Sequence, residues 1–262
     1  MHPYMRVRAS LLLPLAAVLA ICVQRAVVQL DSAAAEAPLA APVAEPEEPP
    51  AEVVAPRIER PKPVTHRLLF VRRDVVLRRR PGGDAAAIAG PTTEFGGARV
   101  LGVATRRGHW LGVVSEDLPN GRVAWVRSGD PAVSARRTAY LLHADLSERS
   151  VELRRGRKVL RRVSVAVGSS GSPTPTGRYA VTDKIRGDRY GPYYGCCILA
   201  LTGRQANTPP GWTGGNRLAI HGTDAPSTIG SPSSAGCLRA SDSDLQVLMR
   251  RVPVGTPVLI RA

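Results

Sequence analysis

Short runs of apolar and β-branched residues recur along this chain from residue 66 onward, and glycine, proline or aspartate separates each run from the next. In the first part of the chain these runs are residues 67–71, 75–77, 98–104, 110–114 and 122–127. The 25 glycines and 23 prolines favour turns and short strands over long helices. The pattern therefore predicts a mainly β fold that begins with a small β-barrel over residues 66–130.

A second group of strands is expected between residues 138 and 262. Alternating runs at 139–143, 145–153 and 159–167 predict consecutive strands joined by tight turns. The apolar run at 258–260 is expected to close the sheet. The sequence thus predicts a second β domain that fills the C-terminal half of the chain.

One helix is expected within this second domain. Residues 241–244 read Ser-Asp-Ser-Asp, which is a capping pattern. Apolar residues follow at helical spacing, namely Leu245, Leu248, Met249 and Val252. A short amphipathic helix with these residues in the core is therefore predicted.

The N-terminal segment, residues 1–35, has a basic start followed by an uncharged apolar run over 9–23. This run is closer in length to a signal-peptide core than to a membrane span of roughly twenty residues. Pro14 and Arg25 also argue against a longer span. We expect export, with this segment acting as a signal peptide or as an N-terminal anchor, and hence a location in the periplasm or cell envelope, at the inner membrane in the anchored case.

A spacer is predicted between this segment and the first β domain. Residues 36–65 are rich in alanine, proline and glutamate, and such a composition buries little apolar surface. Proline-rich chains prefer extended polyproline-like conformations. The segment therefore predicts a linker without a binding site of its own.

The formal net charge of +15 comes almost wholly from arginine, since lysine occurs only at positions 62, 158 and 184. Such a balance suits nucleic acid, an anionic membrane surface or an anionic wall polymer. No nucleic-acid motif or aromatic ladder accompanies the charge, so nucleic-acid binding is not expected. The densest basic cluster, at 154–162, fits either a solvated hairpin face or a contact with an anionic wall polymer.

Cysteine occurs at positions 22, 196, 197 and 237. No Cys-x-x-Cys or Cys/His spacing predicts a zinc site, and no metal is expected elsewhere. In a strand, Cys196 and Cys197 would point to opposite faces, which favours two free, buried thiols. Spacing alone leaves open whether either of them pairs with Cys237.

The stretch 219–239 combines His221 and Cys237 with a connecting segment of glycine, serine, threonine and proline. A thiol is a weak nucleophile until it loses its proton, and an imidazole nearby is the usual base. Glycine at 222 and 236 lets backbone approach a substrate closely, and the N–H groups of Gly236 and Cys237 are candidates for an oxyanion hole. These residues predict a cysteine acyl-transfer site.

The runs His-Gly-Thr at 221–223, Ile-Gly at 229–230 and Ser-Ala-Gly-Cys-Leu-Arg at 234–239 resemble the active-site signature of the L,D-transpeptidase (YkuD) catalytic domain. Segments at 165–168, 173–179 and 252–258 are similar to flanking parts of that family, so the resemblance covers about 138–262. It implies a β-sandwich catalytic domain with a short helix. The preceding segment, 66–130, resembles bacterial SH3-like domains.

The resemblance implies a peptidoglycan L,D-transpeptidase that needs no metal or organic cofactor. Cys237 would be the nucleophile and His221 its base, with Ser234 and Arg239 shaping the loop. Its substrate would be a tetrapeptide stem, cleaved before the terminal D-alanine to give a thioacyl enzyme that an amine of a neighbouring stem resolves as a 3-3 cross-link. Ala235 departs from the histidine that family members often carry before Gly-Cys, which bears on acceptor choice and rate.

Three further residues are expected near the substrate, Gly222 from its place beside His221, and Tyr190 and Tyr193 from the resemblance. Trp212 fits either a lid residue or loop packing. Two alternative functions remain open. Water in place of the acceptor amine would give an L,D-carboxypeptidase, and a non-catalytic cell-wall-binding protein would rely on residues 66–130 and the arginine surface.

Overall fold

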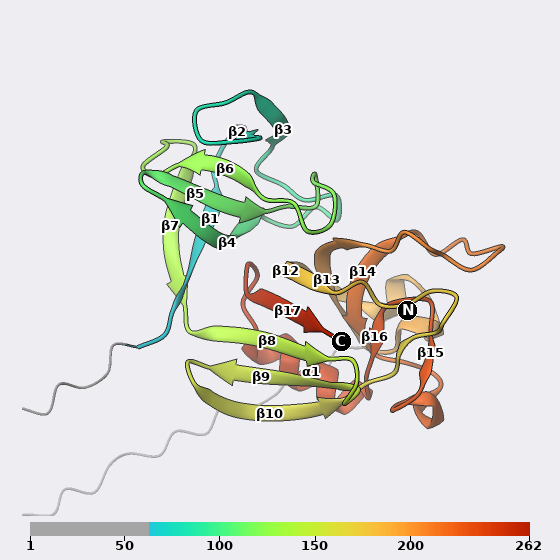
Figure 1. Cartoon of the computed structure of the whole chain (residues 1–262). Helices are drawn as coiled ribbons and strands as arrows, with labels where there is room; N and C mark the ends of the chain where they lie inside the picture. The colour runs from blue at the N-terminus through green and yellow to red at the C-terminus, as the bar shows by residue number, and fades with distance from the viewer. Residues whose placement is uncertain (1–62) are drawn as a thin grey trace, which may run out of the picture. The chain divides into compact units, whose positions relative to one another are not determined.

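The computed structural model describes residues 63–262, which form part of one compact unit. The predicted signal peptide or anchor at 1–35, and nearly all of the predicted linker at 36–65, lie outside the described residues. The described part is mainly β, with 17 strands and one α-helix (Figure 1). The prediction of fold class is therefore confirmed. None of the helices in this part is long and apolar enough to span a bilayer.

The first sheet has seven strands in the order β3-β2-β6-β5-β4-β1-β7. Its strands are β1 (His66–Val71), β2 (Val75–Arg78), β3 (Ala85–Ala89), β4 (Val100–Arg107), β5 (Trp110–Val114), β6 (Ala124–Arg127) and β7 (Val133–Thr138). The five predicted runs all form strands, whereas the sequence does not predict β3 because alanine has a low strand propensity. β7 pairs with β1 along its length, so the sheet continues past residue 130. The likeness to SH3-like domains stays a prediction.

The second sheet has eight strands in the order β10-β9-β8-β17-β12-β13-β14-β16, and a two-stranded sheet joins β11 to β15. The strands of these two sheets are β8 (Tyr140–Asp145), β9 (Ser150–Arg155), β10 (Lys158–Ser164), β11 (Val167–Gly168), β12 (Gly177–Arg186), β13 (Cys197–Arg204), β14 (Arg217–His221), β15 (Pro232–Ser234), β16 (Leu238–Arg239) and β17 (Pro257–Arg261). In the described part, short 3-10 helices interrupt the loops, namely η1 (Gly187–Arg189), η2 (Pro192–Tyr194) and η3 (Pro226–Thr228).

The α-helix, α1 (Asp242–Arg251), begins at the predicted cap. The Ser241 hydroxyl accepts a hydrogen bond from the Asp244 N–H, which satisfies one of the free donors of the first turn. Leu245 and Leu248 are fully buried in the core of the second sheet. The predicted helix and its apolar face are therefore confirmed.

The edge of the second sheet brings the two halves of the predicted site together. Strand β14 ends at His221, and β16 runs parallel beside it with His221 opposite Arg239 and Ile220 opposite Leu238. Cys237 directly precedes β16, and it packs in one apolar cluster with Ala219 of β14. The chain thus folds back so that the candidate base and the candidate nucleophile lie on neighbouring strands.

Candidate active site

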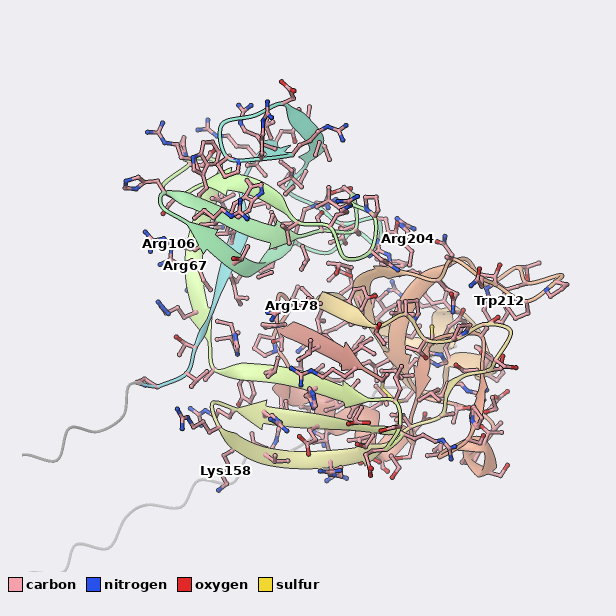
Figure 2. The ribbon with its side chains drawn as sticks, in the orientation of Figure 1. Arg67, Arg106, Lys158, Arg178, Arg204 and Trp212 are labelled. Carbon is pink, nitrogen blue, oxygen red and sulfur yellow. A yellow bond between two sulfur atoms is a disulfide. The ribbon has the colours of Figure 1, made fainter. Side chains whose placement is uncertain are left out.

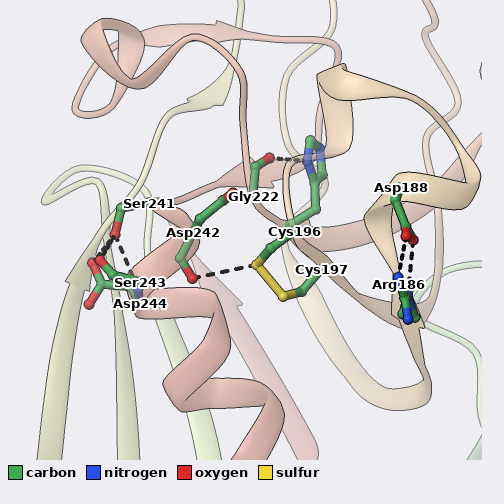
Figure 3. The surroundings of a disulfide bond; sticks show 10 residues. Arg186, Asp188, Cys196, Cys197, Gly222, Ser241, Asp242, Ser243 and Asp244 are labelled. Carbon is green, nitrogen blue, oxygen red and sulfur yellow. Dashed lines mark hydrogen bonds and ion pairs between the residues drawn. A yellow bond between two sulfur atoms is a disulfide. The ribbon is translucent and has the colours of Figure 1, made fainter.

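The imidazole of His221 is fully buried, and a backbone carbonyl orients it. Its Nδ1 lies 2.6 Å from the carbonyl oxygen of Gly222 (Figure 3). A carbonyl can only accept, so Nδ1 carries the proton and Nε2 keeps its lone pair. Nε2 is buried and has no hydrogen-bond partner among residues 63–262. The histidine is therefore held in the tautomer that a general base requires.

The same contact changes the role predicted for Gly222. Its carbonyl accepts from His221, and its N–H donates to the carbonyl of Cys197 at 3.0 Å. Both of its backbone polar groups are used within the protein, so Gly222 positions His221, and its contact with substrate stays a prediction. A side chain here would also strike Asp242, because a Cβ would lie 2.1 Å from its Oδ1.

Burial keeps both members of the pair uncharged at neutral pH. Burial lowers the pKa of His221 to about 4, against an opposing effect of the Gly222 carbonyl and with a smaller lowering by the charge of Arg239. Burial also raises the pKa of the Cys237 thiol to about 11, although the backbone of Ala219 and the charge of Arg239 partly offset it. The free protein therefore holds a neutral thiol and a neutral imidazole.

The Cys237 thiol faces a hollow of about 300 Å³. Its Sγ lies 3.8 Å from the carbonyl oxygen of Arg217. The lining includes Tyr193, Tyr194, Gln205, Trp212 and Ala235. A larger hollow, of about 610 Å³, lies against β4, β12 and β17 and contains neither His221 nor Cys237. We place the chemistry in the smaller hollow because the nucleophile lines it.

Two tyrosine rings cover His221. The ring centroids of Tyr193 and Tyr194 lie 5.5 and 4.9 Å from that of the imidazole. Tyr190 is 49 % exposed, and its ring centroid lies 6.1 Å from that of Tyr194. It thus contacts Tyr194, which in turn contacts His221. Of the two predicted tyrosines, Tyr193 therefore lies at the site and Tyr190 beside it. Sequence reasoning missed Tyr194, since no single-sequence pattern distinguishes it from its neighbours.

Trp212 lies on the loop between β13 and β14 (Figure 2). Its ring centroid is 5.6 Å from that of Tyr193, and its indole N–H donates to the Gly215 carbonyl at 2.6 Å. Trp212 also lines the hollow that contains Cys237. This position favours the interpretation that Trp212 covers the site over the interpretation that it only packs within its loop.

The loop before Cys237 is held by Ser234. The Ser234 hydroxyl donates to the Cys237 carbonyl at 2.6 Å and accepts from the Gly236 N–H at 3.0 Å. The prediction that Gly236 supplies an oxyanion donor is therefore wrong for this conformation, because that N–H already has an intramolecular acceptor. Cys237 N–H is the remaining member of the predicted pair. The loop-shaping role of Ser234 agrees with the geometry.

Arg239 is buried behind the loop. One of its terminal nitrogens donates to the Ser233 hydroxyl at 2.7 Å and to the Thr228 hydroxyl at 3.2 Å. Its guanidinium lies over the ring of Tyr193, 5.7 Å from the centroid. Arg239 thus ties η3 and the nucleophile loop to a tyrosine of the site, and its charge favours a thiolate at Cys237.

Cys196 and Cys197 form a disulfide, so the prediction of two free thiols is wrong (Figure 3). The alternation argument fails because β13 begins only at Cys197, and Cys196 follows Gly195, whose φ is +56°. The S–S bond lies beside the start of α1, where Cys196 Sγ is 3.5 Å from the Asp242 carbonyl. Among the described residues the one free cysteine is Cys237.

The basic cluster on β9 and β10 is partly neutralised within the protein. Glu152 forms ion pairs with Arg154 and Arg162, and Asp244 pairs with Arg161 at 2.5 Å. Lys158 begins β10, next to the turn of the hairpin (Figure 2). These pairs favour the solvated-face reading. Within residues 63–262, no group of three or more His, Cys, Asp or Glu side chains is placed to hold a metal ion.

Comparison with known proteins gives one consistent family. Residues 139–260 match the family model described as the L,D-transpeptidase catalytic domain. The L,D-transpeptidase-family protein YkuD of Bacillus subtilis is 28 % identical over 123 residues, which cover 46 % of this chain and 65 % of that protein. YqjB of the same organism is 34 % identical over 106 residues, which cover 37 % and 57 %. The chain thus spans less than two thirds of the length of these relatives.

Solved structures give the same family name at lower identity. An L,D-transpeptidase from Mycobacterium smegmatis is 19 % identical with a TM-score of 0.40, and the match covers 74 % of this chain and 93 % of that one. An L,D-transpeptidase from Mycobacterium tuberculosis is 20 % identical with a TM-score of 0.38, covering 53 % and 72 %.

Proposed function

Residues 139–260 belong to the L,D-transpeptidase catalytic-domain family, and on that basis we propose that this chain is a peptidoglycan L,D-transpeptidase that forms 3-3 cross-links through a thioacyl intermediate on Cys237. The observation that carries the proposal is the tautomer of His221. Its Nδ1 is held by the Gly222 carbonyl, and its Nε2 keeps a free lone pair on the strand beside the nucleophile.

Proton transfer accompanies nucleophilic attack in the proposed mechanism. Burial favours the neutral form of both groups before substrate binds, because it raises the pKa of the thiol and lowers the pKa of the imidazole. A resting thiolate–imidazolium pair is therefore disfavoured. His221 Nε2 takes the thiol proton as Sγ attacks the carbonyl carbon, and the C–N bond to D-alanine breaks as the imidazole returns that proton to the leaving amine.

The second half of the reaction regenerates the thiol. An amine of a neighbouring stem attacks the thioester carbonyl and His221 accepts its proton. The C–S bond then breaks as the new amide forms, and the imidazolium returns that proton to Cys237 Sγ. The Cys237 N–H is the donor that would hold the oxyanion in both halves. No step needs a metal or an organic cofactor.

Two alternative functions remain. One differs from the transpeptidase only in the second half of the reaction, and the other involves no catalysis. An L,D-carboxypeptidase would use water in place of the acceptor amine, and the shape of the acceptor site decides between them. A wall-binding protein would not use the His221–Cys237 pair. The family's substrate supports export to the cell envelope, where peptidoglycan stems would be the partners. An anionic wall polymer and an N-terminal anchor remain separate proposals.

Mass spectrometry of the purified protein incubated with disaccharide-tetrapeptide tests the proposal. We expect a cross-linked dimer and a thioacyl adduct on Cys237. Cys237→Ala and His221→Ala should each lower product formation by at least about 10³-fold. His109→Ala removes an exposed imidazole on a turn and serves as the matched control, with unchanged activity expected.

The possible products separate the alternatives. Tripeptide with free D-alanine and no dimer would replace the transpeptidase by the carboxypeptidase. No Cys237-dependent product, on free or amidated stems, would overturn the enzyme proposal in favour of a wall-binding protein.

A further inference from the structure

The side chain of Gln205 lies where three loops meet around Cys237. Gln205 follows the last residue of β13 and is only 5 % exposed. Its Nε2 lies 2.9 Å from the Pro173 carbonyl, 3.2 Å from that of Ser172 and 3.3 Å from that of Ala235. One amide group thus contacts two segments at once. These are the loop after β11, residues 169–176, and the nucleophile loop, residues 235–237.

The orientation of this amide is determined by its neighbours. Its Oε1 accepts from the N–H of Asn207 at 3.0 Å, while carbonyl oxygens alone surround Nε2. The reversed amide would place an oxygen against three carbonyls and an NH₂ against an N–H. The side-chain NH₂ of Gln205 therefore donates to the nucleophile loop. Its Oε1 accepts from Asn207, which lies on the β13–β14 loop that carries Trp212.

Gln205 and Ser234 hold the two ends of one peptide unit. The Ala235 carbonyl accepts from Gln205, and the N–H of the same peptide, on Gly236, donates to the Ser234 hydroxyl at 3.0 Å. One residue, Gly236, separates this peptide unit from Cys237. Gly236 has φ +114°, and a Cβ there would lie 1.9 Å from Gln205 Nε2, so the close approach requires glycine.

The backbone of Gln205 also forms a hydrogen bond within the β13–β14 loop, residues 205–216. Its N–H donates to the Asn216 carbonyl at 2.7 Å, which closes the base of the loop that carries Trp212. The same residue therefore connects the β13–β14 loop, the loop after β11 and the nucleophile loop. Gln205 itself, the loop that carries Trp212 and the nucleophile loop all line the hollow that contains Cys237.

We propose that Gln205 is a positioning residue that fixes the plane of the Ala235–Gly236 peptide, one residue before Cys237, and through Gly236 restricts the direction of the thiol and of the Cys237 N–H. The role in catalysis rests on the proposed function. The structural half of the inference, that Gln205 orders the nucleophile loop, stands independently of the substrate.

Two variants of the full-length protein test it. Gln205→Glu keeps the size of the side chain and its acceptor for Asn207, but when ionised it sets an oxygen against three carbonyls. Gln205→Met removes the donor without adding charge. Acylation by disaccharide-tetrapeptide should fall about 10- to 100-fold in kcat for Gln205→Met at pH 7, with KM within about twofold of wild type.

The pH profile separates positioning from a general loss of fold. The carboxyl group introduced by Gln205→Glu would be buried against three carbonyl oxygens, so its pKa should lie above the ordinary glutamate value of about 4.3. When protonated it regains one O–H donor, so the ratio of this variant's kcat to that of wild type should fall as the pH rises from about 5 to about 9. The ratio for Gln205→Met should stay flat. The matched control is Gln246→Glu on the exposed face of α1, which should leave kcat unchanged.

Hydrogen exchange gives a readout that needs no substrate. Amide exchange across residues 234–237 should accelerate at least about 10-fold in Gln205→Met and stay at the wild-type rate in Gln246→Glu. Unchanged exchange in Gln205→Met, or a Gln205→Glu ratio that does not vary with pH, would overturn the inference. A wild-type protein that forms no thioacyl adduct would instead overturn the proposed function, and the exchange rates would still decide the role of Gln205.

Discussion

At the residue scale, burial and a single backbone carbonyl fix the tautomer and the charge of the candidate base, His221. The Gly222 carbonyl selects the tautomer, and the enclosure of the ring by Tyr193 and Tyr194 withholds water from it. A charged imidazole is therefore strongly disfavoured in the folded protein. Because the folded protein disfavours the charged ring, the free energy of unfolding should depend on the protonation of His221.

Stability should fall as the pH is lowered through the range in which His221 is protonated only in the unfolded chain. The unfolded imidazole takes up a proton below its ordinary pKa of 6.5, and the folded one only near about 4. The free energy of unfolding should therefore drop by about 3 kcal/mol between pH 6.5 and 4 from this group alone.

Urea unfolding of wild type and His221→Gln at pH 7 and pH 4.5 measures this term. The variant lacks the titrating ring, so its stability should depend less on pH, while other groups contribute equally to both proteins. Equal pH dependence in the two proteins would show that His221 is not protected from protonation in the fold.

At this scale the sequence points to the candidate nucleophile and base, but not to the residues that contact them. His221 and Cys237 stand out in the sequence because their side chains supply a base and a nucleophile beside glycines. Whether the Gly236 N–H is free depends on the Ser234 rotamer, and Gln205 reaches the loop from 30 residues away. Such contacts depend on where the chain folds back, which local pattern does not describe.

At the element scale, the junction between η2 and β13 departs most from the predicted structure. The chain passes from Tyr193 and Tyr194 through Gly195 to the Cys196–Cys197 disulfide, and the Cys197 carbonyl then accepts from the Gly222 N–H. The disulfide therefore constrains the segment that carries both tyrosines over His221.

Thiol counting tests this junction. A fragment of residues 36–262 contains three cysteines, and we expect one reactive thiol when it is denatured without reductant and three after reduction. Replacing Cys196 and Cys197 together by serine should lower the free energy of unfolding by only about 1 kcal/mol, because a ring closed by adjacent residues removes little chain entropy. Three reactive thiols before reduction would contradict the disulfide.

Predictions made from local periodicity were the accurate ones at this scale. The capping serine and the spacing of Leu245 and Leu248 identified α1, and the alternating apolar runs identified most strands. Alanine-rich β3 was missed because its place in the sheet comes from pairing with β2, not from strand propensity.

At the scale of the whole compact unit, a buried contact and two exposed hydrogen bonds join the two large sheets. The Thr93 hydroxyl donates to Asp183 Oδ1 at 2.6 Å, and both side chains are buried. Asn120 exchanges two hydrogen bonds with the backbone of Arg204, at 2.6 and 2.9 Å. These contacts connect the first sheet to the second sheet, so the stability of one should depend on the other.

Thr93→Val should reveal that coupling. The substitution leaves the buried Asp183 carboxylate without its hydroxyl donor, so the free energy of unfolding should fall by about 1–3 kcal/mol. Thr105→Val, on the exposed end of β4, is the matched control and should change stability by less than about 0.5 kcal/mol. Equal values for the two variants in denaturant titrations would mean that the Thr93–Asp183 contact does not stabilise the unit.

The sequence by itself determined the mainly β character, the helix and the identity of the candidate nucleophile and base. These properties depend on residue type, on alternation and on turn and cap chemistry over a few neighbouring positions. The tertiary structure alone decided that Gly222 orients His221, that Gly236 N–H is occupied, that Cys196 and Cys197 are joined and that Gln205 and Tyr194 border the site. The reason is physical, since a hydrogen bond or a ring contact forms only where folding brings its two partners within a few ångströms at the right angle.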